Sequence, residues 1–243
     1  MKLHILGTSG PFPESNGATS GYLLEADETL IQLDLGSGVL SRLTALTAPE
    51  SLTALLLSHW HFDHAADLPV LMYRLEALGF GVSDSQLPVY APVDESSVLR
   101  KVVSSASCFR LTDVSPGETL SLGSCTVRIG EARHPVPAVS FRVENGGRVF
   151  CYTGDTNTLP SLASFCRNAN LLLADGLFPV GSWTEQKPHL SAALAASLAA
   201  EACAERLVLT HLNPFIPAEV LLDEARSCHP DVSLARPGRV LTV

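Results

Sequence analysis

The sequence has little positive charge and no long apolar run. Among its 243 residues, 16 are Lys or Arg and 25 are Asp or Glu, which gives a net charge of −9. An acidic chain does not attract polyanions over its whole surface, so binding of phosphate groups requires a local source of positive charge. The apolar runs, such as the one around Leu52–Leu57, are far shorter than the roughly 20 residues of a membrane-spanning helix. We therefore expect no membrane segment.

Two further absences concern location and domain number. The six cysteines include no Cys-x-x-Cys pair, and the N-terminus has no charged segment followed by a long apolar stretch. We expect such a chain in the cytoplasm, with reduced cysteines. No linker, repeat or low-complexity tract divides the sequence, so we expect one domain over residues 1–243. The 46% of hydrophobic residues excludes a disordered chain.

The hydrophobic pattern predicts strands first and then a mixture of strands and helices. Asn145-Gly146-Gly147 indicates a tight turn between two strands, because Asn-Gly supplies positive φ angles at low cost. Asp67 is expected to cap a helix over Leu68–Leu78. This order favours a layered α/β (α+β) sandwich over a barrel of βαβ units. The other expected helices lie at 95–107, 159–167, 191–205 and 218–228. The expected strands lie at 2–6, 20–25, 29–35, 53–57, 88–90, 119–122, 125–133, 139–143, 148–152, 171–174, 206–210 and 240–243.

The segment from Ser58 to His64 carries the strongest chemical signal. It reads Ser-His-Trp-His-Phe-Asp-His and follows a predicted buried strand directly. Alternate side chains share a face in extended backbone, so His59 and His61 should point together. Trp60 and Phe62 should then point into the protein.

The turn after this stretch brings Asp63 and His64 beside the two histidines. Imidazoles and carboxylates are the ligands that zinc and related divalent metals take in proteins. In a chain of this composition the pattern His-x-His-x-Asp-His arises by chance about 4 × 10⁻⁴ times. The sequence therefore predicts a metal site here.

The motif resembles the HxHxDH signature of the metallo-β-lactamase superfamily. Four further motifs of that superfamily occur in order, each in a loop after a predicted strand. They are Asp34 in Leu33–Gly38, His134 in Arg133–Pro137, Asp155 in Tyr152–Thr156 and His211 in Leu209–Leu212. The resemblance covers nearly the whole chain and implies the four-layer αββα sandwich of that superfamily.

The resemblance also implies two bound metal ions, which we expect to be Zn²⁺, with Mn²⁺ as an alternative. Asp155 would bridge the two ions, and Asp34 would orient a ligand histidine without touching metal. Such a centre supplies the local positive charge that the acidic chain otherwise lacks. The implied ligands of the two ions are His59, His61 and His134 for one, and Asp63, His64 and His211 for the other.

Within the superfamily the chain is most similar to the ribonuclease Z branch. The shared segments are Leu6–Gly10 with Ala18–Glu25, Val149–Thr156, and His189-Leu190-Ser191 before an alanine-rich helix. The resemblance implies that His189 protonates a leaving oxygen or binds a phosphate oxygen. The alternative is a polar residue at a helix start.

Asp175 takes the place of the Glu in the branch's His-Glu-Ala-Thr motif, while Ala174 and Leu177 replace its His and Thr. We expect Asp175 to hold His189 in one tautomer. Asp63, His189 and Asp175 are therefore the catalytic candidates.

One departure from the branch concerns tRNA. The tRNA-processing members carry a long flexible arm where this chain has only Asn145-Gly146-Gly147, and the loop Gly79–Pro88 is too short and not basic enough to replace it. The missing arm, together with the acidic charge, argues against tRNA or another large nucleic acid as substrate.

We therefore expect a dinuclear zinc phosphodiesterase acting on a small molecule: a cyclic nucleotide, a cyclic ribose phosphate or a short oligonucleotide. Two alternatives stay open. A lactonase or thioesterase would use the same metals, which polarise carbonyls equally well, and a tRNA 3′-end endonuclease is the other. A binding module that merely kept the fold is disfavoured by the complete ligand set.

Homodimerisation is implied by the resemblance. The predicted helix Leu68–Leu78 carries Met72, Tyr73 and Leu75, which could form a dimer face. The same residues could instead cover the sheet of their own subunit.

Overall fold

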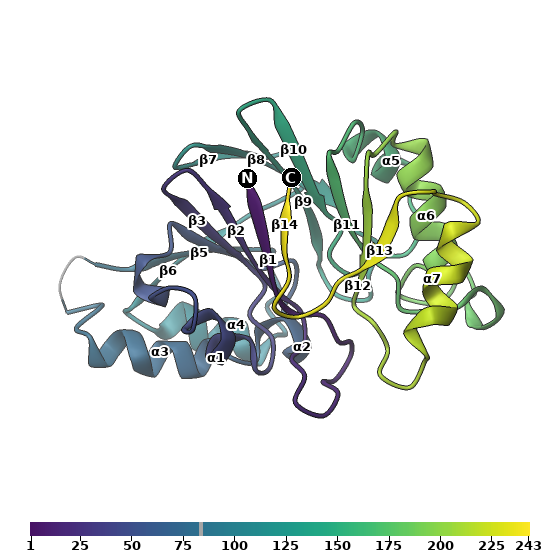
Figure 1. The fold of residues 1–243 in the computed structure, drawn as a ribbon. Helices are drawn as coiled ribbons and strands as arrows, with labels where there is room; N and C mark the ends of the chain where they lie inside the picture. Colours follow the sequence, from purple (N-terminus) through teal and green to yellow (C-terminus); the bar gives the residue numbers. More distant parts are fainter. Residues whose placement is uncertain (83–84) are drawn as a thin grey trace.

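Two seven-stranded mixed sheets lie face to face between outer layers of helices in the computed structural model (Figure 1), which describes residues 1–82 and 85–243. The first sheet has the order β14 (Val240–Thr242), β1 (Lys2–Gly7), β2 (Gly21–Ala26), β3 (Thr29–Leu33), β4 (Ala54–Leu56), β5 (Leu87–Ala91) and β6 (Phe109–Asp113). The second has the order β13 (Val232–Leu234), β12 (Leu207–Thr210), β11 (Leu171–Asp175), β10 (Arg148–Tyr152), β9 (Val139–Asn145), β8 (Cys125–Glu131) and β7 (Thr119–Leu122).

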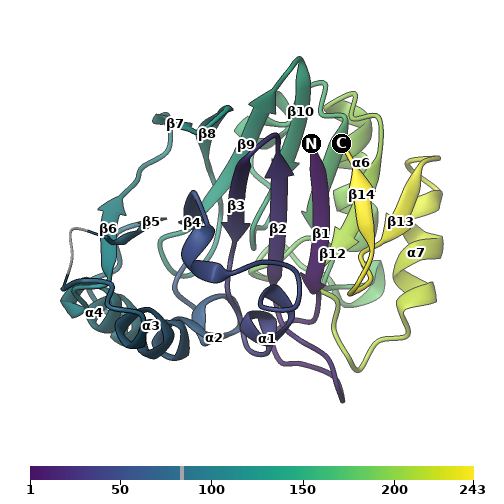
Figure 2. The same cartoon turned by 60° about the vertical axis from the view of Figure 1, so that its left-hand side comes forward.

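Helices cover the outer face of each sheet, and Figure 2 shows the two groups on opposite flanks. Those on the side of the first sheet are α1 (Val39–Leu43), α2 (Phe62–Ala65), α3 (Leu68–Ala77) and α4 (Val98–Ser105). Those on the second are α5 (Ser161–Phe165), α6 (Ala192–Glu201) and α7 (Ala218–Arg226), and two short 3₁₀ turns lie at Pro49–Ser51 and Val180–Ser182. The predicted αββα sandwich is confirmed.

Three apolar clusters hold the layers together. The central one joins the sheets through residues such as Tyr22, Ile31, Phe141 and Phe150, all fully buried. The other two join each sheet to its own helices. Alternation along the strands explains this, because successive side chains face the opposite sheet and the helices in turn.

The Asn-Gly turn is confirmed. Strands β9 and β10 pair in register from Arg148 with Asn145 onward, and Gly146 and Gly147 have φ angles of 56° and 77°. Both residues of a two-residue hairpin turn of this kind need positive φ.

Helix α3 begins directly after Asp67, as predicted, but the prediction that the Asp67 side chain caps this helix is wrong. Asp67 already has helical backbone angles, and its carboxylate accepts the Leu40 N–H at 2.8 Å, in the first turn of α1. It therefore caps another helix across the fold, and burial raises its pKa.

Short elements account for the remaining differences between the predicted and the observed secondary structure. Strands β6 and β13 and helix α1 were not expected, and α4, α5 and α6 are shorter than the predicted helices. Strand β6 reads Phe-Arg-Leu-Thr-Asp and alternates apolar with polar residues over only four positions, a signal too short to mark a strand by itself. Its parallel pairing with β5 establishes it. The prediction that the loop Gly79–Pro88 cannot replace the tRNA-binding arm concerns a segment that lies partly outside the described residues.

Helix α3 packs most of its apolar residues against its own sheet. Leu71 and Leu75 are fully buried and Met72 packs on the same cluster, whereas Tyr73 is 68% exposed. Leu75 is therefore a core residue and not part of a dimer face. Within the described residues, no helix is both long and apolar enough to cross a membrane.

Candidate metal centre

The predicted site residues gather at one edge of the two sheets, where strands from both sheets end. Figure 1 shows α2, which carries part of the set, at this lower edge. Because carboxyl ends of parallel strands meet at the same edge, residues far apart in the chain come together. The residues at or just after strand ends are Asp34 (β3), His59 (β4), His134 (β8), Asp155 (β10), Asp175 (β11) and His211 (β12).

The signature segment leaves β4 in extended form and turns into helix α2. His61 is its last extended residue, with φ −63° and ψ 152°. Trp60 is buried as expected and donates its Nε1–H to the Pro92 carbonyl at 2.8 Å. The prediction that Phe62 points inward is wrong: it is 67% exposed, because α2 begins at this residue and breaks the alternation.

Three imidazoles converge in the first ligand group. Nδ1 of His61 lies 3.0 Å from Nε2 of His59 and 3.1 Å from Nε2 of His134. Burial lowers the pKa of all three histidines, that of His134 to about 4, so they are neutral near pH 7. Neutral imidazole is the form that binds metal.

Neighbouring groups fix how two of these rings are protonated. Ser58 Oγ donates to Asp34 at 2.8 Å and therefore accepts from His59 Nδ1 at 3.0 Å. His134 Nδ1 donates to the Pro188 carbonyl at 3.2 Å. In both rings the proton is held away from the cluster, so the Nε2 lone pair faces into it.

The second ligand group combines two imidazoles with two carboxylates. Asp63 Oδ2 lies 3.1 Å from His211 Nε2 and 3.7 Å from His64 Nε2. Asp155 Oδ2 lies 3.2 Å from His64 Nε2, 3.3 Å from His211 Nε2 and 3.7 Å from His59 Nε2. Asp155 Oδ2 thus lies near imidazole nitrogens of both groups.

Charge balance decides the protonation of this group. Burial would raise the pKa of Asp155, but the charges of His211 and His64 outweigh it and hold that pKa well below its usual range. Burial would lower the pKa of His64, but Asp155, Asp34 and Asp63 outweigh it and raise that pKa well above its usual range.

The donor set fits divalent metal ions. The facing nitrogens of the first group repel one another unless a cation lies between them, and tetrahedral Zn–N bonds place ligand nitrogens about 3.3 Å apart. In the second group His64 Nε2 and Asp155 Oδ1 are buried without a hydrogen-bond partner, which is costly unless an ion satisfies them. Each group has its ligand atoms within 4.8 Å of one another.

Asp34 lies behind the ligands and does not belong to either group. Its fully buried carboxylate accepts from Ser58 N–H at 2.7 Å, His64 Nδ1 at 2.8 Å and Tyr152 OH at 2.7 Å. Sequence reasoning missed Ser58 and Tyr152. Tyr152 lies 118 positions from Asp34, so no local pattern could reveal the contact.

His189 and Asp175 form a close pair beside the second group. His189 Nδ1 donates to Asp175 Oδ2 at 2.7 Å, and the His189 ring stacks on that of His211 with centroids 4.8 Å apart. Burial would lower the pKa of His189, but the charge and hydrogen bond of Asp175 outweigh it and raise the pKa to about 9. Asp175 also accepts backbone N–H groups from Thr156 and Leu177, which holds its carboxylate in place.

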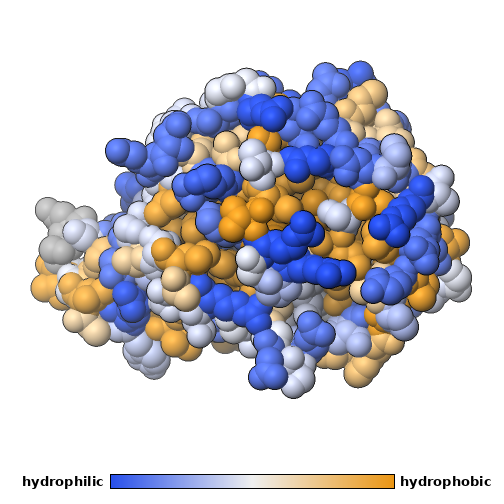
Figure 3. Space-filling model, viewed as in Figure 1, coloured by the Kyte–Doolittle hydropathy of each residue, from blue (hydrophilic) through white to orange (hydrophobic). Residues whose placement is uncertain are grey.

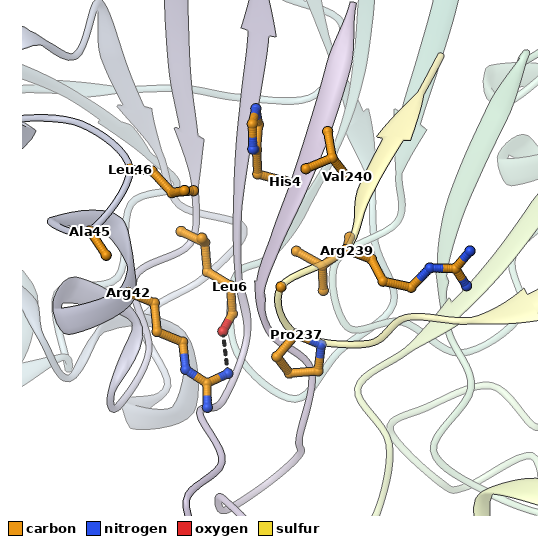
Figure 4. Close-up of a pocket in the computed structure, with 10 residues that line it drawn as sticks. His4, Leu6, Arg42, Ala45, Leu46, Pro237, Arg239 and Val240 are labelled. Carbon is orange, nitrogen blue, oxygen red and sulfur yellow. Dashed lines mark hydrogen bonds between the residues drawn. The ribbon is translucent and has the colours of Figure 1, made fainter.

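An apolar cavity of about 410 Å³ lies away from this cluster, on the outer side of the first sheet. Figure 3, drawn in the view of Figure 1, shows apolar side chains gathered in the middle of the visible face with polar ones around them. Figure 4 shows the lining from α1 and the turn after it, from β1, and from the segment that leads into β14, with Arg42 turned toward the Leu6 carbonyl. None of its lining residues is a predicted site residue.

Comparison with known proteins agrees with this geometry. Residues 33–212 match the beta-lactamase superfamily domain. The probable metallo-hydrolase YhfI of Bacillus subtilis is 31% identical over 99% of both chains, and the uncharacterized protein Rv1339 of Mycobacterium tuberculosis is 31% identical over 93% of this chain and 86% of its own. Ribonuclease Z of Methanopyrus kandleri is 26% identical over 100% of this chain and 98% of its own.

Solved structures give the same result. The metallo-beta-lactamase fold protein YhfI from Bacillus subtilis superposes with a TM-score of 0.90 at 30% identity, covering 99% of this chain and 98% of that one. The short form of human tRNase Z gives a TM-score of 0.82 at 20% identity, covering 100% and 99%. A diphosphatase from the PhnP family gives 0.77 at 17% identity, covering 100% and 97%, and these last two show likeness of fold alone.

The fold and the gathered side chains define an αββα protein with a candidate site for divalent metal ions. The chain belongs to the beta-lactamase superfamily and is a metal-dependent hydrolase with a ribonuclease Z-like form of the metallo-β-lactamase fold.

Proposed function

We propose that the protein is a phosphodiesterase that uses two divalent metal ions, Zn²⁺ in the first instance, to hydrolyse small phosphodiesters. The observation that carries this proposal is the hydrogen-bonded pair of His189 and Asp175. The pair lies beside the second ligand group, because the His189 ring stacks on the ring of His211. A cationic proton donor next to a metal centre suits a reaction in which a charged phosphoryl group is attacked and an alkoxide leaves.

Two ions bound here would supply a Lewis acid for phosphoryl oxygens and a water made acidic near neutral pH. Asp155 would serve both ions, since its Oδ2 reaches imidazoles of both groups. Asp34 would keep His64 Nε2 turned toward the ions by accepting from its Nδ1. The residues that would hold the ions are His59, His61 and His134 in one group and Asp63, His64, Asp155 and His211 in the other.

His189 would act on the leaving oxygen. Its Nδ1 is engaged by Asp175, so the proton available for transfer is the one on Nε2. With a pKa of about 9 the ring carries both protons at neutral pH. It can therefore bind an anionic oxygen and then protonate it as the bond to phosphorus breaks.

The names of the relatives support phosphoester chemistry, and the turn between β9 and β10 limits substrate size. Relatives named ribonuclease Z match nearly the whole chain. Only two glycines, Gly146 and Gly147, separate the paired ends of β9 and β10, so the chain has no arm there to hold a folded RNA. We therefore propose a cyclic nucleotide, a cyclic ribose phosphate or a short oligonucleotide as substrate.

The test is hydrolysis of bis(p-nitrophenyl) phosphate by the zinc-loaded protein, with Asp63→Ala and His189→Ala prepared in parallel. We expect turnover that is lost in Asp63→Ala and reduced in His189→Ala at unchanged zinc content. Lactones and thioesters are assayed beside it. If only these are hydrolysed, and His189→Ala leaves their turnover unaffected, the protein is a lactonase or thioesterase and the proposal fails.

The protein also forms a homodimer in this proposal, through the exposed part of α3, which includes Val70 and Tyr73. Light scattering tests this by comparing the molar mass of Tyr73→Glu with that of the unmodified protein.

A cytoplasmic location is the last part of the proposal. It is supported by the six cysteines, which are all unpaired in the described residues, four of them buried.

A further inference from the structure

Phe12 and Phe215 form an exposed aromatic pair on two separate loops. Their ring centroids are 5.0 Å apart with planes at 55°, and the side chains are 38% and 82% exposed. Phe215 thus keeps most of its surface in water and gains little from burial. The pair offers a large aromatic surface that the fold itself does not use.

Both loops lead directly from the candidate metal centre. Phe215 follows His211 by four residues, and Phe12 follows Gly10 by two. Gly10 lies against the His211 ring so closely that a Cβ there would come within 2.2 Å of it. Figure 1 shows the two loops at the same lower edge of the molecule as α2.

Backbone hydrogen bonds tie the two loops to each other. Gly10 N–H donates to the Leu212 carbonyl at 3.1 Å, and Leu212 N–H donates to the Thr8 carbonyl at 2.7 Å. Phe215 N–H donates to Asn213 Oδ1 at 2.9 Å, which closes its own turn. The backbone therefore fixes the relative position of the two loops that carry the rings.

Arg42 joins the two ends of the loop that carries Phe12. Its guanidinium donates to the Leu6 carbonyl at 2.7 Å, as Figure 4 shows, and to the Asn16 carbonyl at 2.6 Å. A loop clamped at both ends loses little entropy when a ligand docks on it, so it is suited to binding.

We propose that Phe12 and Phe215 form an aromatic platform on which the base of a nucleotide substrate stacks while its phosphodiester lies at the metal centre. Consecutive Cα atoms are at most 3.8 Å apart, so the Cα of Phe12 lies at most about 8 Å from that of Gly10, and the Cα of Phe215 at most about 15 Å from that of His211. A base joined to phosphorus through a ribose spans a distance of this order. Stacking of one base on aromatic side chains strengthens binding about 5- to 150-fold.

This inference rests on the proposed function and names the substrate class: phosphodiesters that carry an aromatic base. It predicts discrimination against the same phosphodiester without a base. If the two rings served only to join the loops, removing one of them would change the binding of both substrates alike.

The kinetic test compares a 3′,5′-cyclic nucleotide with methyl riboside 3′,5′-cyclic phosphate, in which a methoxy group replaces the base. We expect Phe215→Ala and Phe12→Ala to raise KM for the cyclic nucleotide at least fivefold more than KM for the base-free compound. Phe215→Tyr, which keeps a ring, should restore most of the difference. The matched control is Val98→Ala, which trims a 64% exposed apolar residue on α4 and should change neither KM. Equal changes in KM for both substrates, or no change in either KM, contradict the aromatic platform.

A binding measurement separates failure of the platform from failure of the proposed function. Adenosine monophosphate and ribose 5-phosphate are titrated calorimetrically into the zinc-loaded protein and into Phe215→Ala, with zinc content and unfolding temperature recorded for both. We expect the unmodified protein to prefer the nucleotide at least fivefold and Phe215→Ala to lose that preference. If no phosphodiester is turned over but the preference depends on Phe215, the proposed function fails and the platform stands. If phosphodiesters are turned over without any preference for the nucleotide, the platform alone fails.

Discussion

Nδ1 of His64 donates a 2.8 Å hydrogen bond to Oδ2 of Asp34, and both side chains are wholly buried. The same oxygen accepts from Ser58 Oγ and Tyr152 OH. One carboxylate behind the cluster therefore sets the direction in which His64 presents its other nitrogen. Such partners of metal-binding histidines tune metal affinity without touching the ion.

Replacing Asp34 by Asn should weaken metal binding about 10- to 100-fold. The amide keeps the size of the carboxylate but removes its charge, and its NH₂ group cannot accept from His64. Zinc retained after dialysis against a graded chelator series measures the effect. Tyr152→Phe is the control, because it removes a single donor to the same oxygen. Equal zinc affinity in Asp34→Asn and the unmodified protein would contradict the orienting role.

Replacing His189 by Ala should lower kcat on phosphodiesters about 10²- to 10⁴-fold while zinc content stays the same. His189 belongs to neither of the two ligand groups, although its ring nitrogen lies within 4.8 Å of ligand atoms of Asp155 and His211. Stopped assays at saturating substrate, with metal analysis of the same samples, test it. Parallel loss of zinc would instead assign His189 to the metal site.

The Asp175→Asn variant should shift the alkaline side of the pH–rate profile to lower pH. Asp175 raises the pKa of His189 to about 9. A group with a raised pKa is protonated below that value, so proton donation is present at neutral pH and is lost as the pH rises through about 9. Without the charge of Asp175 the loss begins at lower pH. An unchanged alkaline limb in kcat would show that another group titrates there.

Metal binding at pH 7 should release protons, mostly from the second ligand group. In the metal-free protein the raised pKa of His64 keeps it protonated, whereas the pKa of His134 is lowered to about 4 and this ring is already neutral. An ion that binds His64 must displace its proton, so affinity of this group falls as the pH decreases. Proton release is measured by adding zinc to weakly buffered apoprotein with a pH indicator. Its absence would contradict the raised pKa of His64.

Replacing Gly36 by Ala should destabilise the protein by about 1–3 kcal/mol and lower its unfolding temperature by several degrees. A Cβ at Gly36 would lie 2.1 Å from the Asp63 carbonyl oxygen, and Asp63 is a candidate metal ligand. Gly181→Ala is the matched control, because a Cβ there meets nothing within 4 Å. Thermal unfolding of both variants tests the prediction. Equal unfolding temperatures would show that the strand ends at the site yield to the added methyl group.

The sequence could reveal the family and the layered fold because both depend on local patterns. His59, His61, Asp63 and His64 fall within six residues, and the spacing identifies the superfamily without knowledge of any distant contact. Strands with strong apolar alternation and the Asn145-Gly146 turn were likewise predicted correctly. Strands β6 and β13 were missed because runs of five and three residues carry too short a pattern, and parallel pairing with β5 and β12 establishes them.

Sequence alone determined which residues are candidates for binding metal and in which order they follow the strands. Only the tertiary structure decided that Asp67 caps α1, that Phe62 faces solvent, that Tyr152 supports Asp34, and that Phe12 meets Phe215. Each of the three contacts joins segments at least 27 positions apart, and the exposure of Phe62 depends on where α2 begins. Local periodicity carries no record of such contacts, since they arise from the way two sheets and their loops pack together.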